Sequence, residues 1–91
     1  MLKKLLILGA NPETAGLVKK ANDMGCYTIV TDFDPNAYAK QYAAKPINID
    51  ASDVDKLVAF AKTEKIDGVA LGVAESLMPS YASVCTELKM P

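Results

Sequence analysis

Ninety-one residues with a mass of 9.7 kDa are enough for one small domain. Hydrophobic residues make up 51% of the chain and charged residues 23%, a composition that excludes disorder as its main state. The formal net charge is -1 and histidine is absent, so nucleic-acid binding, imidazole-based catalysis and histidine-ligated metal sites lack support.

The two cysteines, Cys26 and Cys85, lie far apart in the sequence and belong to no CxxC pair. Neither a zinc site nor a disulfide framework is therefore expected, and two buried thiols in a reducing cytoplasm are the simplest interpretation. The apolar run near the amino terminus resembles a signal peptide, but it stops at Asn11 and Pro12 and so predicts a strand. No stretch approaches the roughly 20 apolar residues of a membrane span, and we expect a soluble protein.

The first half of the chain predicts a strand, a helix and a second strand. Residues 5–8 are apolar without alternation, as in a strand buried on both faces of a parallel sheet. Asn11 can cap the following helix, Pro12 suits its first position, and Gly25 ends it. Its expected buried face consists of Leu17, Val18, Ala21 and Met24. Residues 26–31 are rich in β-branched and aromatic side chains, which predicts a strand ending at Asp32.

The second half predicts two further strands and three helices. Residues 37–44 form one or two helical turns, and 46–49 begin at a proline, which suits an edge strand. Ser52 is the expected cap of a helix that ends near Glu64, and residues 69–73 are another apolar strand. Ser76 is the expected cap of the last helix, in whose first turn Pro79 is tolerated. The last helix has an expected buried face of Tyr81, Val84, Cys85 and Leu88.

This alternation of strands and helices predicts an α/β fold, a Rossmann-like parallel sheet of about four strands with helices on both faces. An edge position for the third strand and a central one for the first give the strand order 3-2-1-4. Ligands of such folds bind where the strand order reverses, between the first and fourth strands. The loops there are residues 9–13 and 74–76, with residues 32–36 on the adjoining strand.

A dinucleotide site is one hypothesis, because Gly9 follows the first strand and Asp32 ends the second, where a ribose-binding acid would lie. The remaining positions disagree with it. Asn11 and Thr14 stand where glycines are required, Pro12 lacks an amide donor, and Glu13 puts a negative charge where a pyrophosphate would lie. No Walker A lysine motif occurs either. A free-standing small-ligand or dinucleotide-binding module remains the alternative.

Three segments together resemble a known family. They are Leu-Ile-Leu-Gly-Ala-Asn-Pro-Glu at 6–13, Val-Thr-Asp-Phe-Asp-Pro-Asn-Ala at 30–37, and Ile-Asp-Gly-Val at 66–69 leading to Glu75. In order and spacing they resemble the N-terminal, pre-ATP-grasp domain of ATP-grasp enzymes, close to the carbamoyl-phosphate synthase large-chain and biotin-carboxylase-like group. The resemblance covers essentially the whole chain and implies a single domain, residues 1–91, from the amino-terminal end of a longer protein.

The resemblance implies an ATP-dependent ligase that activates a carboxylate as an acylphosphate, which an amine or other nucleophile then attacks. ATP and magnesium would be held mainly by later domains, so no catalysis is expected from these 91 residues alone. The expected partners are those missing ATP-grasp domains and a small-molecule substrate in the cytoplasm, with a homodimer as an option and no nucleic acid or membrane. The implied substrate-binding residues are Gly9, Asn11, Glu13, Glu75 and Ser76. Relatives with a Gly-x-Gly-Glu-Leu-Gly loop hold a phosphorylated ribosyl amine there, and this loop departs from that pattern.

Each of these residues also has a purely structural interpretation. Asn11 with Pro12 is explained by a helix start, and Glu13 by the helix dipole. Asp32 and Asp34 are typical of a turn before a proline. Ser76 is first of all a helix cap. Glu75 has the strongest functional case, because a polar group at the reversal of the strand order is often functional.

Overall fold

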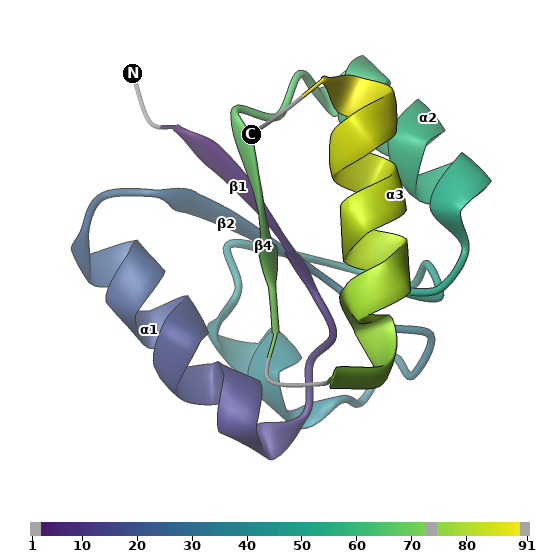
Figure 1. Cartoon of the computed structure of the whole chain (residues 1–91). Helices are drawn as coiled ribbons and strands as arrows, with labels where there is room; N and C mark the ends of the chain where they lie inside the picture. Colours follow the sequence, from purple (N-terminus) through teal and green to yellow (C-terminus); the bar gives the residue numbers. More distant parts are fainter. Residues whose placement is uncertain (1–2, 73–74, 90–91) are drawn as a thin grey trace.

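A computed structural model of the chain describes residues 3–72 and 75–89, and at Glu75 the backbone alone (Figure 1). The strands are β1 (Lys4–Leu8), β2 (Tyr27–Thr31), β3 (Lys45–Ile47) and β4 (Gly68–Leu71). The α-helices are α1 (Ala15–Asp23), α2 (Val54–Glu64) and α3 (Met78–Leu88). Short 3-10 turns are η1 (Pro12–Thr14), η2 (Tyr38–Tyr42) and η3 (Glu75–Leu77).

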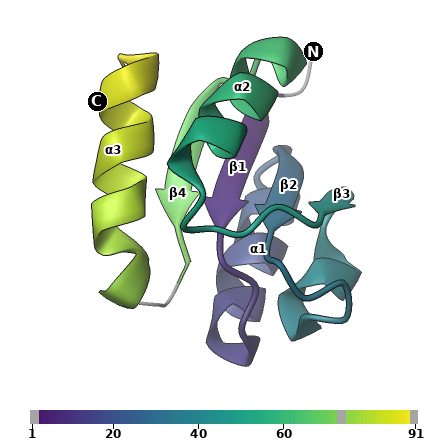
Figure 2. The same ribbon diagram turned by 90° about the vertical axis from the view of Figure 1, so that its right-hand side faces the viewer.

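The four strands form one parallel sheet in the order β3-β2-β1-β4. This confirms the strand order expected from the sequence. Leu6 of β1 is in register with Ile29 of β2 and Val69 of β4, so β1 is central and β4 lies at one edge. The helices cover both faces, with α1 on one side and α2 and α3 on the other (Figures 1 and 2).

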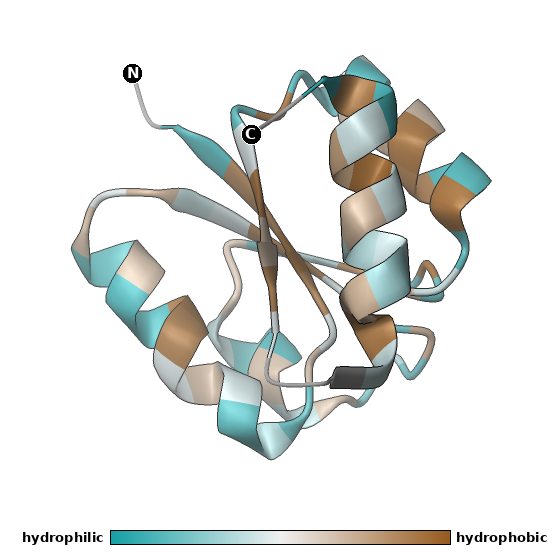
Figure 3. Ribbon diagram, viewed as in Figure 1, coloured by the Kyte–Doolittle hydropathy of each residue, from teal (hydrophilic) through white to brown (hydrophobic). Residues whose placement is uncertain are grey.

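The alternation of side chains along β1 divides the core between the two faces. Leu6 and Leu8 point toward α2 and α3, where they pack with Leu57 and Val84. Ile7 points the other way, into a cluster that contains Val18 of α1. All six side chains are fully buried, and the burial of β1 on both faces explains its unbroken apolar sequence (Figure 3).

The first helix differs from the expectation at both ends. The segment begins as the 3-10 turn η1, whose cap is Asn11, and becomes α-helical only at Ala15. Met24, expected on the buried face, is 73% exposed, because the helix has ended at Asp23 and Met24 is its C-cap. Gly25 then turns the chain with φ +85°, a backbone conformation that favours glycine.

The other two helix caps are also different from those predicted. Asp53 caps α2 by accepting a hydrogen bond from the Lys56 amide at 3.3 Å, while Ser52 donates to Asp50 in the preceding turn. Ser76 lies inside η3 and is not the cap of α3, which Leu77 precedes without a side-chain cap bond. None of the helices within residues 3–72 and 75–89 has the length and apolar character needed to cross a membrane.

Candidate functional site

The carboxyl ends of β1 and β4 lie side by side and bring two of the predicted loops together. The Gly72 amide, just past β4, donates to the Leu8 carbonyl at 2.8 Å, so the pairing continues to the end of both strands. Gly9 leaves β1 with φ +95°, and its amide donates to the Thr31 carbonyl of β2 at 2.9 Å. The 9–13 loop is therefore anchored to β2, and it begins beside the end of β4.

Two glycines allow this close approach. A Cβ on Gly72 would lie 2.6 Å from the Leu8 carbonyl oxygen and 2.8 Å from the Thr14 hydroxyl oxygen, closer than real Cβ atoms come. A Cβ on Gly9 would lie 3.0 Å from a methyl carbon of Leu77 in η3. The glycines thus permit η1 and η3 to pack over the strand ends, which places the predicted site residue Gly9 against the segment that holds Glu75 and Ser76.

Hydrogen bonds within the 9–13 loop fix its shape. The Ala10 amide donates to the Asp32 carboxylate at 3.1 Å. The carboxamide oxygen of Asn11 accepts from both the Thr14 amide at 3.1 Å and the Thr14 hydroxyl at 2.6 Å. Thr14 is fully buried and Asn11 half-buried, so Asn11 performs the capping role expected of it.

Asp32 joins the 9–13 loop to the turn that follows β2. One carboxylate oxygen accepts from Ala10, and the other accepts from the Asp34 amide at 3.0 Å. The Asp34 side chain in turn accepts from the Asn36 amide at 2.9 Å. The first bond forms the Asx turn expected before Pro35, and the second adds another Asx turn that spans Pro35. The link from Asp32 to Ala10 is an additional contact that sequence analysis did not find.

A buried lysine lies beneath this turn. The side chain of Lys40, on η2, is 5% exposed, and its ammonium group donates to the Asp32 carbonyl at 2.7 Å and to the Asn48 side chain at 2.6 Å. Desolvation by burial lowers the pKa of Lys40, and the charges of Asp32 and Asp34 oppose that shift. Lys40 thereby connects the ends of β2 and β3. No sequence pattern distinguishes it from the nine other lysines.

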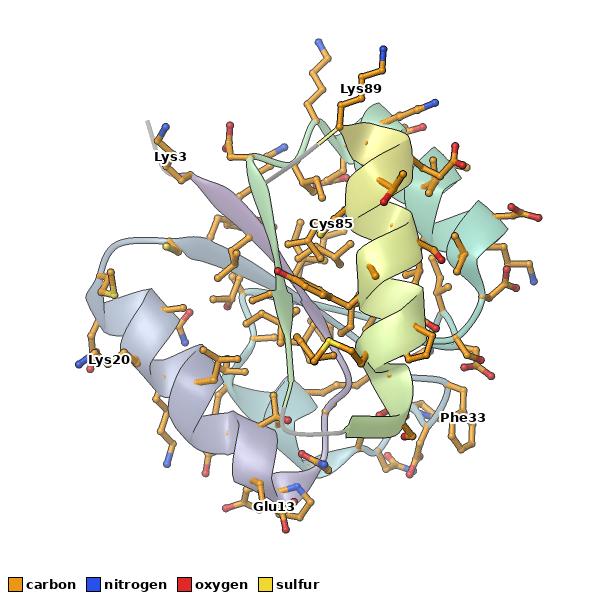
Figure 4. All side chains as sticks on the ribbon, in the orientation of Figure 1. Lys3, Glu13, Lys20, Phe33, Cys85 and Lys89 are labelled. Atoms are coloured by element: carbon orange, nitrogen blue, oxygen red, sulfur yellow. The ribbon has the colours of Figure 1, made fainter. Side chains whose placement is uncertain are left out.

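The side chains that face solvent are different from those that hold the loops. Glu13 is exposed at the start of η1, and Ser76 is exposed in η3. Figure 4 shows Glu13 at the outer end of the loop. The side chain of Glu75, the other predicted acid, lies outside the described residues. Glu13 and Ser76 are thus available to a ligand, whereas Gly9 and Asn11 shape the loop.

An open depression of about 520 Å³ lies next to η2, on the β2 and β3 side of this edge. It is lined by Pro35, Asn36, Ala37, Tyr38, Lys40, Gln41 and Pro46. It therefore lies away from the reversal of strand order between β1 and β4, where the sequence placed the site. In the described part of the chain, no group of three acidic or cysteine side chains could hold a metal ion.

The fold and the positions of the loops define the class of this domain. It is a Rossmann-like parallel α/β domain whose loops lie where the strand order reverses, between β1 and β4. Among solved structures it is similar to phosphoribosylglycinamide synthetase from Anaerococcus prevotii, with 32% identity, a TM-score of 0.85, and coverage of 98% of this chain and 23% of that one. N5-carboxyaminoimidazole ribonucleotide synthetase from Thermotoga maritima matches at 23% identity and TM-score 0.75, covering 94% of this chain and 23% of that one. A xanthine dehydrogenase from Bacillus halodurans, at 20% identity and TM-score 0.54, covers 86% and 32% and shares only the fold.

The first two proteins are ATP-grasp ligases, and the match falls on their N-terminal domains. The chain has the fold of the N-terminal domain of ATP-grasp enzymes, which confirms the resemblance to that class. The closeness to the carbamoyl-phosphate synthase large-chain and biotin-carboxylase-like group stays a prediction. It spans about a quarter of the length of these two ligases. No protein-family model matches the sequence, and no curated protein does.

Proposed function

We propose that this chain is the N-terminal, substrate-side domain of an ATP-grasp ligase. Such an enzyme activates a carboxylate as an acylphosphate, and an amine or other nucleophile then attacks it. The observation that carries the proposal is the 32% identity, over 98% of the chain, with the N-terminal domain of phosphoribosylglycinamide synthetase. Within the ATP-grasp enzymes, the three sequence motifs favour the carbamoyl-phosphate synthase-like group.

In this proposal the 9–13 loop and η3 form one wall of the acceptor-substrate cleft. Gly9 and Asn11 set the shape of that wall through their backbone and cap hydrogen bonds. Glu13 and Ser76 are exposed beside them, where a carboxylate and a hydroxyl can bind an amine or hydroxyl of the acceptor. Glu75 belongs to the same wall by its position in η3.

The residues described do not fit ATP and magnesium. The Gly9, Ala10 and Thr14 amides donate within the protein, and Pro12 has no amide hydrogen to offer a phosphate. We therefore assign ATP and Mg²⁺ to further domains of the same protein, which are also the expected partners of this domain. Accordingly, we expect no catalysis from the 91-residue chain by itself and place the complete enzyme in the cytoplasm.

The first experiment is the intact mass of the native gene product in an extract of its own cells. We expect a chain several times larger than 9.7 kDa. A native mass of 9.7 kDa would contradict the ligase assignment and favour a small binding module, for which saturable NADH binding is the direct test. ATP hydrolysis by the purified 91-residue chain would contradict its assignment as non-catalytic.

The second experiment is made on the full-length protein with a panel of amines and carboxylates, by following ADP formation. Glu13→Ala and Ser76→Ala are compared with Asp23→Ala and Ser83→Ala, which remove the same groups from exposed positions away from this wall. We expect the first pair to raise the KM for the acceptor and leave the KM for ATP unchanged. Equal behaviour of the two pairs would show that the wall does not bind the acceptor.

A further inference from the structure

Acids lie at both ends of the sheet, since Glu64 pairs with Lys4 and Lys45 at the amino end, but the loops at the carboxyl end lack lysines. The loops that follow the carboxyl ends of the strands are residues 9–14, 32–37, 48–53 and 72–77, and their sequence contains no lysine or arginine. Five acidic residues with described side chains lie in them: Glu13, Asp32, Asp34, Asp50 and Asp53. Glu75 adds a sixth acid to the same set of loops.

Most lysines lie toward the opposite end. Lys4 and Lys45 are the first residues of β1 and β3, Lys65 ends α2, and Lys89 ends α3. Figure 4 shows Lys3 and Lys89 at the end of the molecule opposite Glu13. The sequence contains no arginine, the residue best suited to bind a phosphate with two parallel hydrogen bonds.

The two lysines that follow the acidic loops are engaged within the protein. The ammonium group of Lys40 is buried and donates to the Asp32 carbonyl and the Asn48 side chain. Lys56, in the first turn of α2, lies 3.9 Å from the Asp53 carboxylate. Neither group adds an uncompensated positive charge to the carboxyl edge.

Three backbone donors of the 9–14 loop are already engaged within the protein. The amides of Gly9, Ala10 and Thr14 donate to Thr31, Asp32 and Asn11, and residue 12 is a proline. A phosphate-binding loop instead directs its amides outward, at a helix end without an acidic side chain. Here the exposed carboxylate of Glu13 occupies that position.

We infer that the part of the acceptor that meets the 9–13 loop is neutral or cationic and is not a phosphate ester. The inference rests on the proposed function, since it specifies the substrate class of the same wall. By this inference the acceptor differs from those of the two ligases that the chain resembles, whose names specify a phosphoribosyl compound and a ribonucleotide. Glu13 and Pro12 are the residues assigned to this selectivity.

The field is measured directly by NMR on the 91-residue chain with two small nitroxides of opposite charge, aminomethyl-proxyl and carboxy-proxyl. We expect the cationic probe to relax the amide hydrogens of Glu13 and Asp34 at least about threefold more than the anionic probe. The order should reverse at Lys3 and Lys65. Glu13→Lys should lower the ratio at the loop, whereas Asp23→Lys, the same charge change at the other end of α1, should leave it unchanged.

Binding is tested by titrating the same chain with ribose 5-phosphate, up to about 10 mM, a concentration that detects weak sites. We expect no saturable shift of the Gly9, Ala10 or Thr14 amides. Saturable shifts at these amides, or a field that favours the anionic nitroxide, would overturn the inference. Neither measurement needs turnover, so a failure of the ligase assignment in the full-length protein is seen separately.

Discussion

Replacing Lys40 with methionine tests whether one buried ammonium group holds the carboxyl edge together. Methionine keeps the unbranched stem and removes the charge. The group donates to the Asp32 carbonyl at 2.7 Å and the Asn48 carboxamide at 2.6 Å, and its side chain is 5% exposed. Hydrogen bonds from a charged donor contribute about 1.5–3 kcal/mol each, and burial of the ammonium group offsets part of this. We expect a net loss of about 2–4 kcal/mol, or roughly 10–25 °C in Tm.

The assay is urea unfolding followed by circular dichroism, with Lys62→Met on α2 as the matched control. Lys62 is exposed, so its replacement should change the free energy of unfolding by less than about 0.5 kcal/mol. Equal stability of the Lys40→Met and Lys62→Met variants would refute the reasoning. Amide exchange adds a local measurement, because loss of Lys40 should speed exchange at Asp34 and Ala10, which depend on the position of Asp32.

The pH dependence of the same pair of proteins gives an independent check. Burial lowers the pKa of Lys40 in the folded state below its ordinary value of 10.5. Between those two values the unfolded chain binds more protons than the folded one, so stability from this group rises with pH. The difference in unfolding free energy between wild type and Lys40→Met should therefore increase as the pH approaches 10.5. A difference that shrinks over this range would show that the charged form is preferred on folding.

Three further predictions concern backbone space, a helix end and an ion pair. Gly72→Ala should destabilise the protein by about 1–3 kcal/mol, because the new Cβ would lie 2.6 Å from a β1 carbonyl oxygen. Gly16→Ala should instead stabilise the protein by about 0.5–1 kcal/mol, because a Cβ there would have nothing within 4 Å. Equal Tm changes would contradict this. Lys65→Gly should raise stability by about 1 kcal/mol in urea titrations, because position 65 has φ 59° at the end of α2, and a loss would contradict it. The hydrogen bond from Lys45 lowers the pKa of Glu64 below 4.5, so its stabilisation is present above that pH and lost as the pH falls through the folded-state value. Glu64→Gln should accordingly flatten the acid limb of the unfolding free energy, and an unchanged limb would contradict the ion-pair account.

The strand order could be predicted because it follows from local patterns. An apolar run without alternation, as in β1, indicates burial on both faces, and a proline within β3 favours an edge position. Helix caps were harder to predict, since either of two adjacent polar residues can serve as the cap. Ser52 was the predicted cap, but its hydroxyl donates to Asp50 and Asp53 caps α2 in its place.

The contacts that shape the candidate site could not be predicted in the same way. Lys40 is buried only because Asn48, from the loop after β3, and the end of β2 meet above it. Gly72 is required because the Leu8 carbonyl of β1 and the Thr14 hydroxyl of η1 both lie within 3 Å of the place where a Cβ would stand. Both are consequences of tertiary packing between segments distant in sequence. Glu13 was placed correctly in the first turn of a helix, because that property depends on its own segment alone.

The candidate site separates residues that hold the loops from residues that face solvent. The holding contacts use backbone amides, Asp32, Asn11 and two glycines, and they keep the end of β1 in place whatever side chain stands at position 13 or 76. Exposed positions on such a scaffold can change without altering its hydrogen bonds. A domain of this fold can therefore serve ligases with different acceptors. Selectivity between acceptors should then follow charge at the loop surface, so Glu13 is the position where exchange of side chains should alter substrate choice at the least cost in stability.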